Sequence, residues 1–178
     1  MVGASAQGQR DSRLLQIEIK SIGPVDCLKK QRSGLDADMS ATNKELAKRW
    51  FEEVWNQGRR ETICEMLAPD AVVQEGERET VGPEGFYPFF ERMQGAFSDI
   101  HVKIQDAISE ADKVCVRWSA TMRHTGSGMG PPTNKYLQTT GISVIRIAGG
   151  KFVAGWQNWD MLGLMQQIKG EPALSTKR

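Results

Sequence analysis

The residues best suited to chemistry come at the end of the last strand that the sequence predicts, where Trp156, Asn158 and Asp160 have the same parity. The apolar Phe152 and Ala154 share that parity, and alternate residues of a strand face the same side of a sheet. We therefore expect an amide and a carboxylate to converge beside the Trp156 ring. Desolvation by such a ring raises the pKa of a carboxyl group, which suits a general acid or base near neutral pH.

Asp160 also has a structural explanation. It directly precedes the apolar residues 161–164, and aspartate is a favoured N-cap whose side chain accepts a hydrogen bond from the first turn of a helix. The capping role and the catalytic role both stay open at this point.

His124 is the second candidate for a polar site. It ends a predicted strand over residues 112–124 and has the parity of the apolar Val114, Val116 and Trp118, so its ring is expected on the core side, at the rim of a cavity. A buried neutral imidazole needs only one donor and one acceptor, so a core-edge histidine explains it equally well. No local spacing gives His124 and His101 the carboxylate partners that a metal site would need.

A stripe of large side chains is predicted on one face of a helix that begins at Pro83. Such a stripe is typical of plain core, but on a short helix it can also line a cavity. Pro88 should kink this helix. The stripe consists of Phe86, Phe90, Met93 and Phe97, and we count the first three, with Trp118, Trp156 and Asn158, as candidate substrate-binding residues.

The elements that must position these residues change from helical to strand spacing along the chain. Helical spacing covers residues 42–58, 60–68, 83–97 and 160–170, and strand patterns cover 71–75, 101–108, 112–124, 135–148 and 151–159. Helices followed by a meander of strands predict an α+β fold. We expect a cone in which a curved antiparallel sheet holds the N-terminal helices on its concave face.

The first 38 residues lack this patterning, with a single short apolar cluster at 14–17. We expect residues 1–38 to be a disordered extension or a non-native start before Met39, and a docking arm is the alternative. Residues 39–170 should form one domain, and 171–178 a C-terminal tail.

Composition argues against several classes of protein. The chain has 23 Lys and Arg against 22 Asp and Glu, with no run of five like charges, so we expect no nucleic-acid partner. Cys27, Cys64 and Cys115 have neither disulfide-framework nor zinc-site spacing, which indicates a reducing compartment and no metal. No apolar stretch approaches the about 20 residues of a membrane span, and no signal peptide is evident. We expect a cytoplasmic protein without a membrane partner.

Several segments together resemble the SnoaL-like polyketide cyclases, also called ester cyclases, of the NTF2-like superfamily. The likeness runs from about Asn43 to Gly170, and its most specific part is the pattern W-x3-D-x2-G-L-x2-Q. The segments are GPEG at 82–85, AFSD at 96–99, VRW at 116–118, PPTNK at 131–135, GKFV at 150–153 and WQNWDMLGLMQQ at 156–167.

The resemblance implies a cone-shaped α+β fold, a homodimer or larger homo-oligomer, and a closure of a polyketide ester by an intramolecular aldol reaction without metal or cofactor. It assigns the acid/base role to Asp160, makes His124 a polar partner, and places Trp156 and Asn158 in the pocket wall. The family's Gly-Thr-His reads Met-Arg-His at residues 122–124, which places bulk beside His124.

Three functions remain open from the sequence. The first is a cyclase, lyase or isomerase that acts on a small apolar carbonyl-bearing molecule with Asp160 as base. The second is a non-catalytic ligand-binding or oligomerisation module. The third is a hydrolase similar to the superfamily's epoxide hydrolases, for which Arg146 would supply the cation although no aspartate lies two residues from it. A closed pocket of roughly 300–1,000 Å³ that reaches Asp160 would support the first, and a filled cone the second.

Overall fold

The computed structural model describes residues 39–170, so the expectations for residues 1–38 and 171–178 lie outside the described residues. Residues 39–50 are helical and continue into the π-helical turn η1 (Phe51–Asn56), followed by α2 (Glu61–Met66), α3 (Gly82–Ala96) and α4 (Met161–Lys169). The strands are β1 (Leu67–Glu75), β2 (Arg78–Val81), β3 (Phe97–Glu110), β4 (Lys113–His124), β5 (Tyr136–Ala148) and β6 (Lys151–Trp159).

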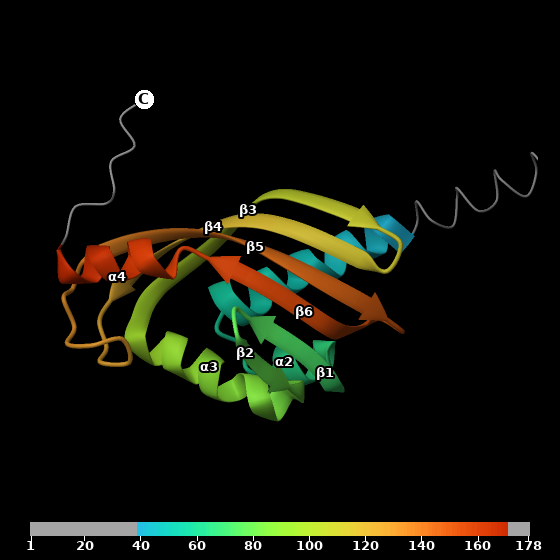
Figure 1. Ribbon diagram of the computed structural model, residues 1–178, viewed down its shortest axis with the longest axis horizontal. Coiled ribbons are helices and arrows are strands. Elements are labelled where there is room, and N and C mark those ends of the chain that lie inside the picture. The colour runs from blue at the N-terminus through green and yellow to red at the C-terminus, as the bar shows by residue number, and fades with distance from the viewer. Residues whose placement is uncertain (1–38, 171–178) are drawn as a thin grey trace, which may run out of the picture.

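The six strands form one sheet in the order β2-β1-β6-β5-β4-β3. Neighbouring strands are antiparallel except β1 and β6, which pair in parallel. Figure 1 shows the sheet curling from β3 down to β1 and β2, with the first helix on its concave side and α3 across the lower part of the cone. The predicted α+β cone with helices on the concave face is confirmed.

Alternation along β4 separates the two faces of the sheet as predicted. Val114, Val116 and Trp118 are buried together with His124, whereas the residues between them are exposed or half-buried. The face toward the helices is called the inner face below, and the opposite one the outer face. Because a strand has a period of two, this partition fixes the register of β4 against its neighbours.

The helices differ from the sequence expectation at several boundaries. The first helix is already formed at Met39, so Thr42 does not begin it. Pro88 lies inside α3, which runs without a break to Ala96, and Phe97 is the first residue of β3 rather than part of the helix. Strand β2, which the sequence analysis does not include, completes a hairpin with β1.

A bulge in β6 reverses its two faces. Ile147 of β5 pairs with Phe152, but Arg146 pairs with Ala154, so β6 holds one extra residue, Val153, at this point. Such an insertion shifts the alternation of every later residue. The alternation that starts at Phe152 therefore does not hold beyond the bulge. Gly155, Gln157 and Trp159 pair with inner-face residues of β5. The residues expected on the inner face, Trp156, Asn158 and Asp160, are exposed instead.

Candidate active site

The inner face of the sheet and the helices enclose an apolar cavity of about 60 Å³, called the inner cavity below. Four aromatic side chains from η1, α3 and β4 form much of its wall, and β6 closes one end with Gln157 and Trp159. The aromatic residues are Phe51, Trp55, Phe89 and Trp118. Ordinary ligand pockets are roughly 300–1,000 Å³, so most of the cone is filled by side chains.

Trp118 occupies its place in the wall because β5 has a glycine opposite it. Trp118 pairs with Gly141, where an added Cβ would lie 2.4 Å from Cζ2 of the ring. The indole nitrogen Nε1 of Trp118 donates a hydrogen bond of 3.0 Å to Oγ of the buried Ser143. The ring is thus held flat against β5, with its polar atom satisfied.

An open depression of about 460 Å³ adjoins the inner cavity, and Gln157 and Trp159 line both spaces. We call this depression the vestibule. Its other walls are the β1–β2 turn at residues 75–78, Arg92 of α3, Met129 of the loop after β4, Asn158 and Met161. The vestibule is the larger and the more polar of the two spaces.

Glu75 is a carboxylate in the wall of the vestibule, next to Trp159, which lines both spaces. It is half-buried at the end of β1, pairs with Gln157 of β6, and accepts a hydrogen bond at Oε1 from the indole nitrogen of Trp159. Within the described residues, no Lys or Arg nitrogen lies within 4.0 Å of its carboxylate.

Glu75 is not among the site residues expected from the sequence, although its position in the strand pattern points to it. Ala71 is buried and Val73 half-buried, and Glu75 continues the same parity to the end of the strand. A carboxylate on the inner-face register of a short strand is the pattern that would have identified it.

Arg92 is the basic residue of the vestibule that is most enclosed. It is half-buried, its guanidinium carbon lies 5.6 Å from the centroid of the Phe89 ring, and its Nε atom is buried without a hydrogen-bond acceptor in the described residues. The glycine-rich loop after β4 covers its backbone: a Cβ on Gly128 would lie 2.9 Å from the Arg92 carbonyl oxygen.

Asp160 lies outside both spaces and caps α4. Its Oδ1 accepts a hydrogen bond of 2.8 Å from the Gly163 nitrogen, and the side chain is exposed. The expected convergence of Trp156, Asn158 and Asp160 inside the cone is wrong, because the bulge in β6 places all three on the other parity.

His124 lies on the core side of β4, as its parity predicts, but it lines none of the spaces described above. It is fully buried, with Nδ1 3.2 Å from Oγ1 of Thr133 and its ring centroid 5.5 Å from that of Phe97. Its Nε2 has no hydrogen-bond partner within the described residues.

The structure divides the other candidate residues among different places. Trp118 and Met93 line the inner cavity, and Asn158 lines the vestibule. Phe86 and Trp156 border a second cavity of about 40 Å³ on the β1 and β6 side. Phe90 is buried in the core, 6.1 Å from Trp55 between ring centroids, and lines none of these cavities.

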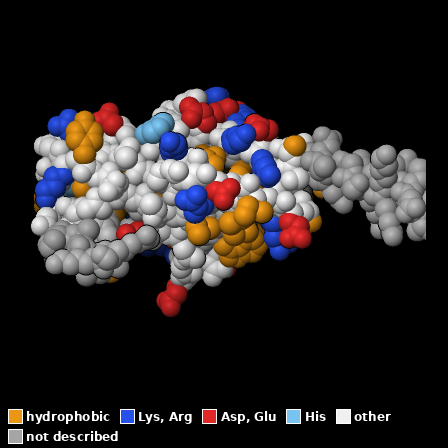
Figure 2. Space-filling model, turned by 90° about the horizontal axis from the view of Figure 1, so that it is seen from above, with side chains coloured by type: hydrophobic (Ala, Val, Ile, Leu, Met, Phe, Trp, Pro, Cys, Tyr) orange, Lys and Arg blue, Asp and Glu red, His pale blue; other side chains and the backbone are white. Residues whose placement is uncertain are grey.

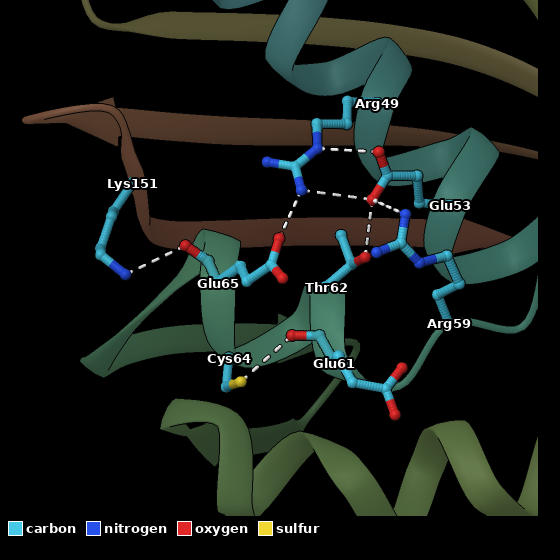
Figure 3. Close-up of polar contacts among 8 residues, drawn as sticks. All are labelled: Arg49, Glu53, Arg59, Glu61, Thr62, Cys64, Glu65 and Lys151. Atoms are coloured by element: carbon cyan, nitrogen blue, oxygen red, sulfur yellow. Dashed lines mark hydrogen bonds and ion pairs between the residues drawn. The ribbon is translucent and has the colours of Figure 1, made fainter.

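A cluster of charged residues anchors α2, which leads directly into β1 and Glu75 (Figure 3). Arg49 contacts both Glu53, at 2.9 Å, and Glu65, while Oγ1 of Thr62 donates a hydrogen bond of 2.7 Å to Glu53. The hydrogen bonds from Arg49 and then Thr62 lower the pKa of Glu53 to about 2. This cluster lines none of the cavities, so its role is to fix α2 against the first helix.

Within residues 39–170 there is no group of three His, Cys, Asp or Glu side chains arranged to hold a metal ion. In the same part of the chain, no helix is long and apolar enough to cross a membrane.

Comparison with known proteins identifies relatives of this architecture. A candidate SnoaL-like polyketide cyclase from Jannaschia sp. CCS1 has a TM-score of 0.68 at 22% identity, covering 75% of this chain and 96% of that one. A candidate polyketide cyclase from Acidithiobacillus ferrooxidans has a TM-score of 0.66 at 27% identity, covering 74% and 96%. A protein from Catenulispora acidiphila with a ketosteroid isomerase-like fold, solved with trimethylamine, has a TM-score of 0.60 at 16% identity, covering 74% and 97%.

The first and third of these similarities show the fold alone, and they confirm the NTF2-like cone. No curated protein matches the chain. A family model described as SnoaL-like polyketide cyclase matches residues 45–168, well over half of the sequence. The chain therefore belongs to the SnoaL-like polyketide cyclase family.

Proposed function

We propose that this protein is a cyclase, lyase or isomerase that acts on a small apolar carbonyl-bearing molecule by acid/base catalysis, with Glu75 as the acid/base residue. The observation that carries this proposal is the position of Glu75, half-buried in the wall of the vestibule and hydrogen-bonded to Trp159, which lines both the vestibule and the apolar inner cavity. A hydrogen bond that fixes the orientation of a carboxylate prepares it for proton transfer.

The chemistry requires a base and a group that stabilises an enolate. Trp159 holds Oε1 of Glu75, which leaves Oε2 to take a proton from the carbon next to a carbonyl group. The electron pair becomes an enolate, and the Gln157 amide, which lines both spaces, is the donor for its oxygen.

In a cyclisation, the enolate carbon attacks a second carbonyl of the same molecule and a carbon–carbon bond forms. The resulting alkoxide takes the proton from Glu75, so the base is regenerated and no co-reactant is consumed. In an isomerisation, the proton returns to a different carbon. Both reactions fit a site that exchanges one proton with its substrate.

Two variants test the assignment of the base. Proton abstraction is followed as deuterium incorporation into 2-tetralone and acetophenone in D₂O by NMR. Glu75→Gln keeps the size of the side chain and should lower the protein-catalysed rate about 10²–10⁴-fold. Asp160→Asn is the matched control, because asparagine remains a good N-cap and Asp160 lies outside the site. Exchange that is lost in Asp160→Asn and kept in Glu75→Gln would return the base to Asp160.

A non-catalytic ligand-binding module is the second candidate, and the small volume of the inner cavity favours it. About 60 Å³ is well below the roughly 300–1,000 Å³ of ordinary ligand pockets. An absence of protein-catalysed exchange with both ketones would favour this candidate.

The hydrolase alternative is not favoured. It would need Arg146 as a cation in the site, but Arg146 is exposed on the outer face and pairs with Ala154.

We also infer that the protein forms a homodimer or a larger homo-oligomer through the outer face of the sheet. A row of paired residues crosses that face from β3 to β6: Ile108, Cys115, Val144 and Trp156. Ile108 is 65% exposed, Trp156 41%, and the adjacent Ile142 49%. Figure 2 looks down on the molecule from the sheet side and shows hydrophobic side chains gathered among charged ones. Exposed apolar patches of this kind mark association surfaces.

A further inference from the structure

We propose that the vestibule binds a small amphipathic carboxylate, whose carboxylate group is held by Arg92 and whose apolar tip, no larger than a few carbon atoms, enters the inner cavity. This inference deepens the proposed function, because it makes the carbonyl-bearing substrate a molecule with a carboxylate at one end and an apolar remainder, and it rests on that function for the location of the site.

Arg92 carries a charge that no described residue neutralises. It is half-buried and lines the vestibule, and no carboxylate of the described residues lies within 4.0 Å of its guanidinium nitrogens. Its Nε atom is covered by protein, so the two terminal nitrogens are the donors available to a ligand in the vestibule.

The shape of the guanidinium indicates which anion fits it. Its two terminal nitrogens each carry an N–H, these two bonds point in parallel, and this edge matches the two oxygens of a carboxylate. A carbonyl oxygen alone would satisfy only one of the two donors. The planar anion that fits both is therefore a carboxylate.

The Arg92 side chain lies beside an aromatic ring of its own helix. Its guanidinium carbon lies 5.6 Å from the centroid of the Phe89 ring, and the loop after β4 packs onto the end of α3. Thr125 and Gly126 each donate a backbone hydrogen bond to the Ala96 oxygen, at 3.1 and 3.0 Å. A Cβ on Gly126 would lie 1.8 Å from the Gly95 oxygen, so glycine is required for the loop to pack this closely on α3.

The volumes of the two spaces limit the size of the ligand. The inner cavity of about 60 Å³ has space for a methyl or ethyl group, and a ring must stay in the vestibule of about 460 Å³. The ligand that satisfies both spaces has an anionic end at Arg92, a ring-sized body in the vestibule and a short alkyl tip beyond Gln157.

Para-alkyl benzoates have these three parts and are suitable probes. They lack a proton on a carbon next to the carboxylate, so they bind without being turned over. Binding is measured by calorimetry and by the fluorescence of the tryptophans, of which Trp159 lines both spaces. We expect 4-ethylbenzoate to bind at least tenfold more tightly than 4-ethylbenzamide, about fourfold more tightly than 4-methylbenzoate because of one additional methylene, and more tightly than 4-tert-butylbenzoate.

Three variants separate Arg92 from the other charges. Arg92→Gln should abolish the preference for benzoate over benzamide, and Arg92→Lys should keep part of it because the charge remains without the paired donors. Arg146→Gln is the matched control, since Arg146 is exposed on the outer face. Thermal unfolding shows whether Arg92→Gln is folded. If it is unfolded, the role of Arg92 is judged from Arg92→Lys and from the difference between benzoate and benzamide binding to the wild type.

Equal binding of the benzoate and the benzamide to the wild type would overturn the proposal, as would an unchanged preference in Arg92→Gln. Tighter binding of 4-ethylphenyl phosphate than of 4-ethylbenzoate would overturn it in favour of a phosphate site. Glu75→Gln should still bind 4-ethylbenzoate. The outcome for Arg92 is therefore distinguishable from the outcome for the catalytic role of Glu75, which is read from deuterium exchange.

Discussion

The side-chain amide of Asn56 bonds both the backbone N–H and the backbone C=O of Val102, as a neighbouring strand would. The Val102 nitrogen donates to Oδ1 of Asn56 at 2.6 Å, and Nδ2 of Asn56 donates to the Val102 oxygen at 3.1 Å. An amide side chain thus satisfies two backbone groups at the free edge of β3. It also joins the π-helical turn that holds Trp55 to the strand that holds Val102, and both of these residues line the inner cavity.

Asn56→Ala should lower the free energy of unfolding by about 1–3 kcal/mol, because it leaves two backbone groups without partners. Urea denaturation at neutral pH measures the change. Gln57→Ala is the control: the Gln57 side chain is exposed and bonds only Glu52, so its loss should cost less than about 0.5 kcal/mol. Equal midpoints for Asn56→Ala and the wild type would contradict the role given to this pair.

Gly141→Ala should destabilise the protein by about 1–3 kcal/mol through overpacking against Trp118. The new Cβ would lie 2.4 Å from Cζ2 of the ring, and the ring cannot retreat without giving up its hydrogen bond to Ser143. Gly155→Ala provides a matched comparison on the same face of the sheet, because its Cβ would lie 3.7 Å from the nearest atom. Thermal unfolding should show a clearly lower midpoint for Gly141→Ala than for Gly155→Ala.

Glu53 should make stability fall in acid. Its folded-state pKa is lowered from 4.5 to about 2, mainly by the hydrogen bond from Arg49. A depressed pKa contributes stability that is fully present above the unfolded-state value and is lost as the pH falls through the folded-state value. Glu53→Gln should therefore lose less stability than the wild type between about pH 5 and pH 2. Urea unfolding at several pH values measures this, with Glu84→Gln, an exposed residue, as the control.

Asp160→Ala should cost about 1 kcal/mol of stability through the loss of the α4 N-cap, whereas Asp160→Asn should cost almost nothing. Neither variant should alter deuterium exchange into ketones beyond the effect of partial unfolding. Helical circular dichroism and chemical denaturation measure the capping effect. A stability loss as large in Asp160→Asn as in Asp160→Ala would show that Asp160 does more than cap the helix.

Trp156→Lys should shift the oligomer to monomer by placing a charge in the apolar row of the outer face. Sedimentation velocity at micromolar concentration measures the change in mass. Leu162→Lys is a suitable control, because Leu162 is an even more exposed apolar residue, on α4 and away from that row. A wild type that sediments only as the 19.8 kDa species would contradict the inferred association.

Local patterns predicted most of the fold because their causes are local. Alternation along β4 and the helical spacing of Phe86, Phe90 and Met93 depend only on which side of an element is buried, and the structure agrees with both. The N-cap at Asp160 was foreseen as one of two roles for the same reason: its partner is three residues away.

The site was harder to predict because it depends on pairing between distant segments. Val153 is an extra residue only in relation to β5, and a matching register shift occurs where β6 meets β1 between Leu67 and Val72. Nothing in residues 151–160 alone reveals that shift. The parity of Asp160 was therefore extrapolated across a bulge, and the carboxylate of the opposite strand, Glu75, was missed.

The parallel pairing of β1 with β6 also determines when the site forms during folding. Glu75 and Trp159 are 84 residues apart, and the strands that hold them meet only after β2 to β5 have been added to the chain. Closing so long a loop carries an entropic cost that short hairpins such as β3–β4 avoid, so β1 and β6 are expected to join late. During synthesis on a ribosome, Glu75 could therefore form its hydrogen bond with the Trp159 indole only after nearly the whole domain has emerged.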